Sequence, residues 1–86
     1  MHEHLSTKEM GWVLGRSQGT VRDMIREGEL QAVRIVGGFR IPKEEALRAA
    51  RDHVEVESGR RLSDRRLEVL IDEVIESNEA RTRLAG

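Results

Sequence analysis

The sequence has no cysteine, a single proline and only two aromatic residues, Trp12 and Phe39, among its 86 residues. Without cysteine the chain has no disulfide bonds and no thiolate chemistry, which suits a cytoplasmic protein. With so few aromatic side chains, the core must be built mainly from Leu, Ile, Val, Met and Ala, and such a core is marginal at this length. We therefore expect one small domain that a partner or a dimer helps to stabilise.

Several functional classes are excluded by what is missing. The first residues lack the basic start and apolar stretch of a signal peptide, and no apolar run approaches a membrane span, so we expect no membrane association. The sequence shows no nucleophile with a base and no paired carboxylates, so we predict no catalytic residue and no enzyme. His2 and His4 form at most a weak metal pair without a third ligand, so we predict no metal site and no cofactor.

The positive charge is concentrated in the first part of the chain, although the net charge is −1. Up to Arg51 there are nine Lys and Arg against seven Asp and Glu, whereas the remainder has six against nine. A nucleic-acid-binding domain is usually more basic than this. The placement of the charges matters more than their total. Whether the chain can bind nucleic acid therefore depends on where each arginine lies.

Residues 15–28 carry the signals of a short helix with a defined start and end. Ser17 can cap the N-terminus by accepting a hydrogen bond from a backbone N–H, and Gly28 can end the helix in the left-handed conformation. Apolar residues spaced three and four apart predict a buried stripe. The opposite face presents Gln18, Gly19, Arg22, Asp23 and Arg26.

A second short helix is expected just before it. Ser6 and Glu9 have the spacing of a capping box, and Gly15 ends this helix after about two turns. Two short helices joined by a tight turn predict a helix-turn-helix, with the helix at 17–27 as the recognition helix. Gly11 inside the first helix costs about 1 kcal/mol relative to alanine. Either another backbone passes close to it or the glycine is simply tolerated.

A β-hairpin is expected next, because branched residues at 33–36, a double glycine and a return strand at 39–41 follow one another. A two-residue Gly37-Gly38 loop would mix charged and apolar side chains on both faces. We therefore prefer a three-residue loop at 36–38, which pairs Arg34 with Arg40 and places both on one face. Their mutual repulsion would be relieved by an anionic partner.

Two further helices are expected after the hairpin, one from Pro42 to about Ser58 and one capped by Ser63. The last helix has a one-sided apolar stripe. This stripe could pack on its own domain or on a second chain, and we favour self-association into a homodimer. Residues 59–86 thus form an oligomerisation or packing element behind a domain at 1–58. The stripe consists of Leu67, Leu70, Ile71, Val74 and Ile75.

Several runs in the first part of the chain, at 5–9, 14–15, 17–21, 25–30, 32–35 and 37–42, occur in a familiar order. Through them, residues 5–50 resemble the excisionase-like, MerR-type helix-turn-helix family of bacteria and phages. The resemblance implies a mainly α fold with a small β-hairpin, a winged helix-turn-helix, here followed by a C-terminal amphipathic helix. It also implies that the second helix enters the major groove of double-stranded DNA and that the hairpin wing lies against phosphates or in the minor groove.

The predicted function is therefore sequence-specific DNA binding by a small cytoplasmic transcriptional regulator or recombination-directionality factor. Asp23 stands where the family usually has a basic or polar DNA contact, and phosphate repels a carboxylate unless it accepts from a cytosine amino group. The alternative is a noncatalytic adaptor on the same fold, whose acidic second half binds a partner regulator. The predicted DNA-binding residues are Ser17, Gln18, Gly19, Thr20, Arg22, Arg26, Arg34, Gly37, Gly38 and Arg40.

Overall fold

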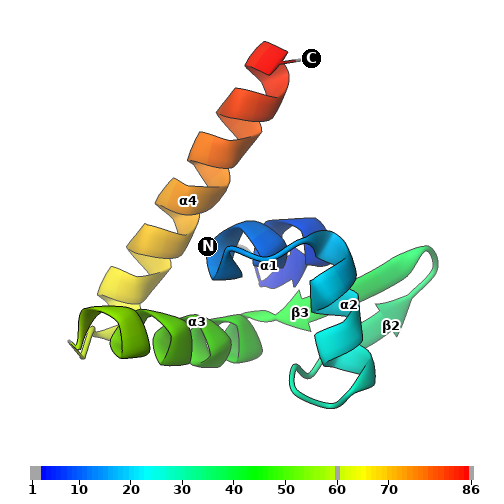
Figure 1. The fold of residues 1–86 in the computed structure, drawn as a ribbon, viewed down its shortest axis with the longest axis horizontal. Coiled ribbons are helices and arrows are strands. Elements are labelled where there is room, and N and C mark those ends of the chain that lie inside the picture. The colour runs from blue at the N-terminus through cyan, green and yellow to red at the C-terminus, as the bar shows by residue number, and fades with distance from the viewer. Residues whose placement is uncertain (1–2, 60, 86) are drawn as a thin grey trace.

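The computed structural model describes residues 3–59 and 61–85, except for the side chains at 54–58. The described residues fold into four helices, which Figure 1 labels, and a three-stranded antiparallel sheet in the order β1-β3-β2. This is the expected winged helix-turn-helix with a C-terminal helix. The elements are β1 (His4–Ser6), α1 (Thr7–Leu14), α2 (Gln18–Arg26), β2 (Val33–Ile35), β3 (Gly38–Pro42), α3 (Lys43–Ser58) and α4 (Asp64–Ala85).

The ends of α1 and α2 are fixed by the capping residues predicted from the sequence. Ser6 Oγ accepts from the N–H of Glu9 at 3.1 Å, and Glu9 Oε1 accepts from the N–H of Ser6 at 2.8 Å, which completes the capping box. Ser17 caps α2 through the backbone N–H one turn later. Gly15 and Gly28 have φ angles of 65° and 81°. Each helix is therefore followed by a residue in the left-handed conformation, which glycine adopts more readily than other residues.

The turn between α1 and α2 is closed directly over Gly11. The N–H of Arg16 donates to the carbonyl of Gly11 at 2.9 Å. A Cβ on Gly11 would lie 2.7 Å from the carbonyl oxygen of Arg16, closer than side-chain carbons approach oxygens. Of the two interpretations of this glycine, close backbone approach is therefore correct.

Strand β1 was not expected from the sequence. It pairs with the second half of β3, with Leu5 opposite Ile41 and His4 opposite Pro42, and both Leu5 and Ile41 are fully buried. The strand is only three residues long, too short for a periodic pattern to reveal it. Pro42 was expected to be the first residue of α3, but it is the last residue of β3, and the helix begins at Lys43.

The hairpin formed by β2, β3 and their turn, here called the wing, has neither of the registers considered from the sequence. Its turn is Val36-Gly37, so Ile35 lies opposite Gly38 and Arg34 lies opposite Phe39. Gly37 has a φ of 88°, the value that the third residue of a type II turn requires, and Gly38 after it also has a positive φ, of 157°. The predicted pairing of Arg34 with Arg40 is therefore wrong.

The register also separates these two arginines. Residues opposite one another in an antiparallel pair share a face, and neighbours along a strand alternate. Arg34 therefore shares the face of Phe39, whereas Arg40 lies on the other face, opposite Val33 on one side and Ser6 on the other. The expectation that both guanidiniums share one face of the wing is corrected by this geometry.

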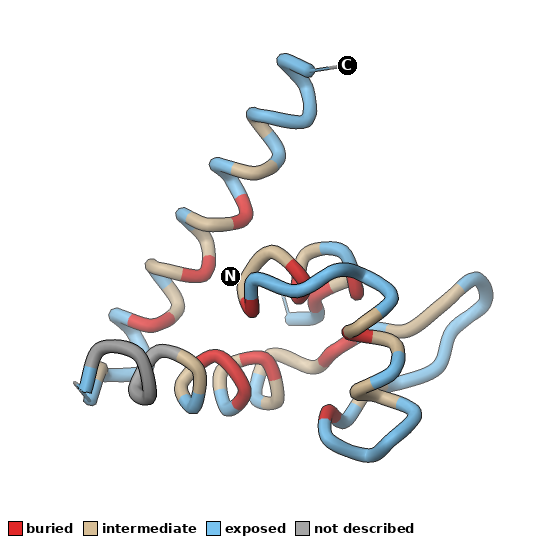
Figure 2. Tube along the Cα trace, viewed as in Figure 1, coloured by how far each residue is buried: buried red, intermediate tan, exposed pale blue. Residues whose placement is uncertain are grey.

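Helix α4 packs on its own chain. Leu67, Ile71 and Ile75 are buried in the same core as the residues of the helix-turn-helix, and α4 contacts both α1 and α3. Leu70 and Val74 are half-buried beside them. Figure 2 shows buried positions only along the first half of α4, whereas its far half extends away from the body. The apolar stripe of α4 is thus covered by α1 and α3 of the same chain. That the stripe also mediates a homodimer stays a prediction, which the molar mass from analytical ultracentrifugation would test.

The segment after α2 is held to α3 by Glu45. Its carboxylate accepts from the N–H of Gln31 at 2.7 Å and from the guanidinium of Arg48 at 2.7 and 2.8 Å. Arg48 in turn donates to the carbonyl of Glu29 at 3.2 Å. The hydrogen bond from Arg48, assisted by the one from Gln31, lowers the pKa of Glu45, while partial burial acts in the opposite direction.

This brace predicts a pH-dependent stability. Because the pKa of Glu45 is lower in the folded chain, its contribution is present near neutrality and is lost as the pH falls below about 4.5 and through the folded value. We expect Glu45→Gln to lower the free energy of unfolding at pH 7 by up to about 1 kcal/mol and to flatten its decline in acid. Urea unfolding at a series of pH values measures this, with the exposed Glu44→Gln as the control. An equal acid-side decline in wild type and Glu45→Gln would contradict the assignment.

Candidate nucleic-acid interface

Helix α2 has one buried side and one exposed side. Val21 is fully buried, and Met24 and Ile25 pack partly buried against the core. The opposite side carries a stripe in which each residue lies three or four positions from two other members, so its members are neighbours on one face of the helix. This exposed stripe consists of Gly19, Asp23 and Arg26, which are exposed, and Arg22, which is half-buried.

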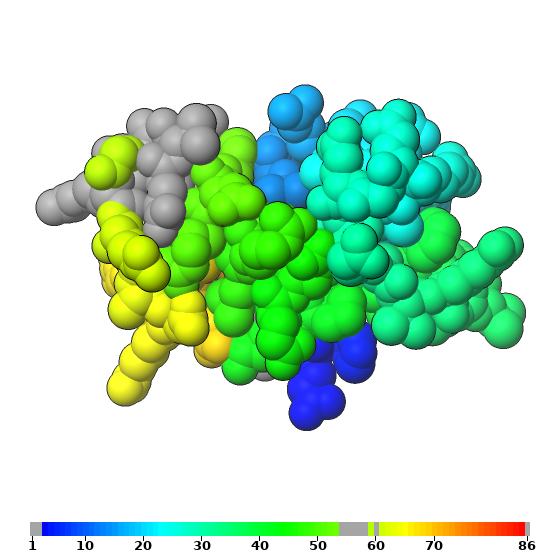
Figure 3. Space-filling view, turned by 90° about the horizontal axis from the view of Figure 1, so that it is seen from below, coloured from blue at the N-terminus to red at the C-terminus, as the bar shows by residue number. Residues whose placement is uncertain are grey.

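A groove separates α2 from the wing, and three arginines line it. Arg22 and Arg26 enter it from α2 and Arg34 from β2. Among the residues that the structure describes, no Asp or Glu lines this groove, and the nearest acidic partner of its arginines is Asp23, which lies 3.4 Å from Arg26. Figure 3 shows α2 and the wing together at one end of the molecule, with the start of α4 at the other end. The remaining lining residues are Ile35, Gly37, Gly38 and Phe39.

The start of α2 is held in place by its own polar side chains. Gln18 Nε2 donates to Thr7 Oγ1 at 3.0 Å, which links the beginning of α2 to the beginning of α1. The hydroxyl groups of Ser17 and Thr20 share a hydrogen bond of 2.9 Å. Gln18 therefore links the two helices, Ser17 and Thr20 fix the start of α2, and the contact of these three side chains with DNA stays a prediction.

Comparison with known protein families matches residues 5–51 to the helix-turn-helix domain of excisionase-like proteins. The match covers α1, α2, the wing and the first half of α3, which is more than half of the chain. The chain belongs to this family. Comparisons with curated proteins and with solved structures found no significant match.

Membership assigns roles to the elements already described. The helix-turn-helix is a DNA-binding motif whose second helix is the recognition helix, and in this chain that helix is α2. That the exposed stripe of α2 contacts DNA stays a prediction. Among the helices that the structure describes, none combines the length and apolar content that crossing a membrane requires.

The structure divides the predicted site residues into three groups. Five surround the groove, four form the start of α2, and Arg40 lies on the outer face of the sheet, away from the groove. The groove group is Arg22, Arg26, Arg34, Gly37 and Gly38, and the helix-start group is Ser17, Gln18, Gly19 and Thr20.

Sequence reasoning missed the apolar tip of the wing. Val36 is fully exposed at the turn, and Val33 and Ile35 are exposed along β2. A branched apolar residue in a two-residue turn is the signal that could have revealed it, because hairpin turns are normally polar. The tip therefore offers an apolar contact beside the arginines of the groove.

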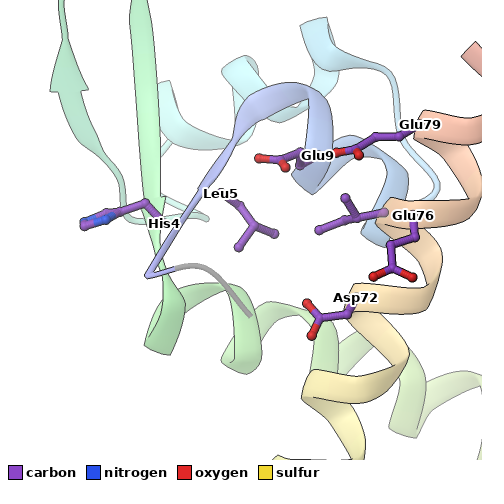
Figure 4. Close-up of a pocket in the computed structure, with 7 residues that line it drawn as sticks. His4, Leu5, Glu9, Asp72, Glu76 and Glu79 are labelled. Atoms are coloured by element: carbon purple, nitrogen blue, oxygen red, sulfur yellow. The ribbon is translucent and has the colours of Figure 1, made fainter. Parts of the chain in front are cut away.

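A small acidic pocket lies on the α4 side of the molecule. It has a volume of about 180 Å³, and its carboxylates come from Glu9 of α1 and from Asp72, Glu76 and Glu79 of α4. His4 also lines it, but its side chain points away from the carboxylates (Figure 4). The described residues include no group of three or more His, Cys, Asp or Glu arranged to hold a metal ion, and His2 lies outside them. The carboxylates that line this pocket contrast with the arginines that line the groove.

Proposed function

We propose that this chain is a noncatalytic, sequence-specific binder of double-stranded DNA. It is a cytoplasmic protein of bacterial or phage type. Its role is that of a small MerR-type transcriptional regulator or of a recombination-directionality factor. The observation that carries the proposal is the convergence of Arg22, Arg26 and Arg34 on one groove without a carboxylate in its lining. The acidic pocket and the groove share no lining residue.

Within this proposal the two sides of the groove have different tasks. Arg22 and Arg26 project from the recognition helix, where guanidinium groups read guanine edges in the major groove. Arg34 projects from the wing and contacts a backbone phosphate, which fixes position without reading sequence. Gly37 and Gly38 add no side chain, so the turn can approach the sugar-phosphate backbone closely.

The wing provides a matched pair of substitutions. We expect Arg34→Ala to weaken binding to all duplexes alike and to reduce the slope of log affinity against log salt by about one, because one phosphate contact is lost. Arg40→Ala removes the same charge from the other face of the wing and is expected to change the slope by clearly less. Fluorescence anisotropy at several salt concentrations measures both slopes. Equal changes in the two variants would contradict the assignment of Arg34 to the interface.

The proposal as a whole is tested by titrating the purified chain with a random-sequence duplex at low salt. A DNA-binding protein shows an affinity that falls as salt rises. An adaptor of the kind predicted as the alternative shows none under these conditions. Selection of bound sequences from a random pool then reports the preferred site, and an unenriched pool would contradict sequence-specific binding.

A further inference from the structure

We propose that Asp23 is a specificity-determining residue, which selects a cytosine by accepting a hydrogen bond from its N4 amino group in the major groove. The inference rests on the proposed function, because it names the base that the recognition helix reads. It assigns a task to the one acidic residue on the exposed stripe of α2.

Asp23 lies near the middle of the surface that α2 turns outward. It follows Gly19 by one turn and precedes Arg26 by one turn, so all three lie in one row. Gly19 has no side chain, and a Cβ built there would meet nothing closer than Ser17 Oγ at 3.9 Å. The row is therefore open in front of Asp23, and a base edge can approach its carboxylate.

A carboxylate at this position has to be compensated when DNA binds. In the free chain it is 66% exposed and pairs only loosely with Arg26, at 3.4 Å, so most of its hydration is intact. Contact with DNA removes that water and brings phosphates near, which costs binding energy unless a donor replaces the water. In the major groove such donors are the amino groups of cytosine and adenine.

The neighbouring arginine favours cytosine over adenine. A C·G pair presents the cytosine donor beside the O6 and N7 acceptors of guanine. Asp23 offers an acceptor and Arg26 offers donors, and the distance of 3.4 Å between Arg26 Nη1 and Asp23 Oδ1 places the two groups next to each other. Adenine instead presents its N7 acceptor next to its amino group, where it repels a carboxylate. The Asp23–Arg26 pair is thus complementary to a C·G pair.

The test is selection from a random DNA pool with the wild-type chain and with Asp23→Asn, Asp23→Ala and the control Asp52→Asn. Asp52 lies on α3, off the exposed stripe, and carries the same charge, so its substitution reports any general effect of removing a carboxylate. Circular dichroism verifies that each variant is folded. The wild-type site is then altered at its enriched cytosine, and affinities for the altered and unaltered duplexes are compared.

We expect the wild type and Asp52→Asn to discriminate against the altered duplex by roughly 5- to 30-fold. Asp23→Ala is expected to lose this discrimination, and Asp23→Asn to shift it toward adenine, since the asparagine amide pairs with adenine. If both Asp23 variants keep the wild-type preference and merely bind every duplex more tightly, the inference is overturned while the proposed function stands. If the wild type binds no duplex, the proposed function itself fails, and that result is distinct from a lost base preference.

Discussion

Replacing Arg22 with alanine is expected to weaken binding to the preferred duplex by about 1–3 kcal/mol, roughly 5- to 150-fold, and to relax base choice at one position. Arg22 lies on the exposed stripe of α2 and lines the groove that faces the wing. A guanidinium there can donate two hydrogen bonds to guanine, and alanine leaves both acceptors without a partner. The measurement compares affinities for the preferred site and for single-base variants of it.

The control for this experiment is Arg81→Ala. Arg81 lies on the far half of α4, fully outside the groove, and its removal changes the net charge by the same amount. We expect it to leave base preference unchanged and to shift affinity only slightly, because charges beyond about 10 Å are screened at 0.1 M salt. A loss at Arg22 that is the same for every sequence would show that this arginine contacts phosphate and reads no base.

The second large effect concerns stability. Gly11→Ala is expected to lower the free energy of unfolding by about 2 kcal/mol, against the usual gain from replacing a helical glycine. The new Cβ would lie 2.7 Å from the carbonyl oxygen of Arg16, and this is backbone, so the turn between α1 and α2 must shift. In a domain of this size we expect the melting temperature to fall by roughly 8–16 °C. Thermal and urea unfolding measure both quantities.

Gly19→Ala is the matched comparison, because Gly19 is also helical but has open space around it. Its substitution is expected to leave the fold unchanged or to stabilise it by up to about 1 kcal/mol. A shift in the α1–α2 turn also rotates the recognition helix relative to the rest of the domain. We therefore expect Gly11→Ala to weaken specific DNA binding, whereas a fully stable Gly11→Ala variant would contradict the close approach.

The parts of the fold that local chemistry determines could be predicted from the sequence. Ser6 with Glu9, Ser17, Gly15 and Gly28 mark the ends of α1 and α2, because each end requires a particular hydrogen bond or a positive φ angle. The exposed stripe of α2 followed from spacing alone. The same spacing places Arg22 and Arg26 on the side of α2 that the groove borders.

The parts that depend on pairing between distant segments could not be predicted in this way. The register of the wing differs by one residue from the preferred one, and a shift of one residue moves every side chain to the other face. This is why Arg34 was assigned to the face of Arg40 instead of the face of Phe39. Strand β1 lacks any local signal, since its stability comes from β3 and from the burial of Leu5.

The sequence likewise left open whether the last helix packs on its own chain or on a second copy of the chain. A one-sided stripe predicts burial but does not name the surface that covers it. In the fold, the length of α3 and the connection after it bring α4 back over α1, with Lys43 of α3 forming an ion pair of 2.7 Å to Glu68. The same arrangement raises the pKa of Lys43, mainly through its hydrogen bond with Glu68.

The packing of α4 has a consequence for how the protein is made. Residues 5–51, which carry the recognition helix and the wing, leave the ribosome before α4 does. Until Leu67 and Ile71 emerge, the apolar faces of α1 and α3 that α4 covers lie open in the nascent chain. We therefore expect α1 and α3 to reach their final packing only when α4 has emerged, so that a polypeptide truncated before α4 is prone to aggregate.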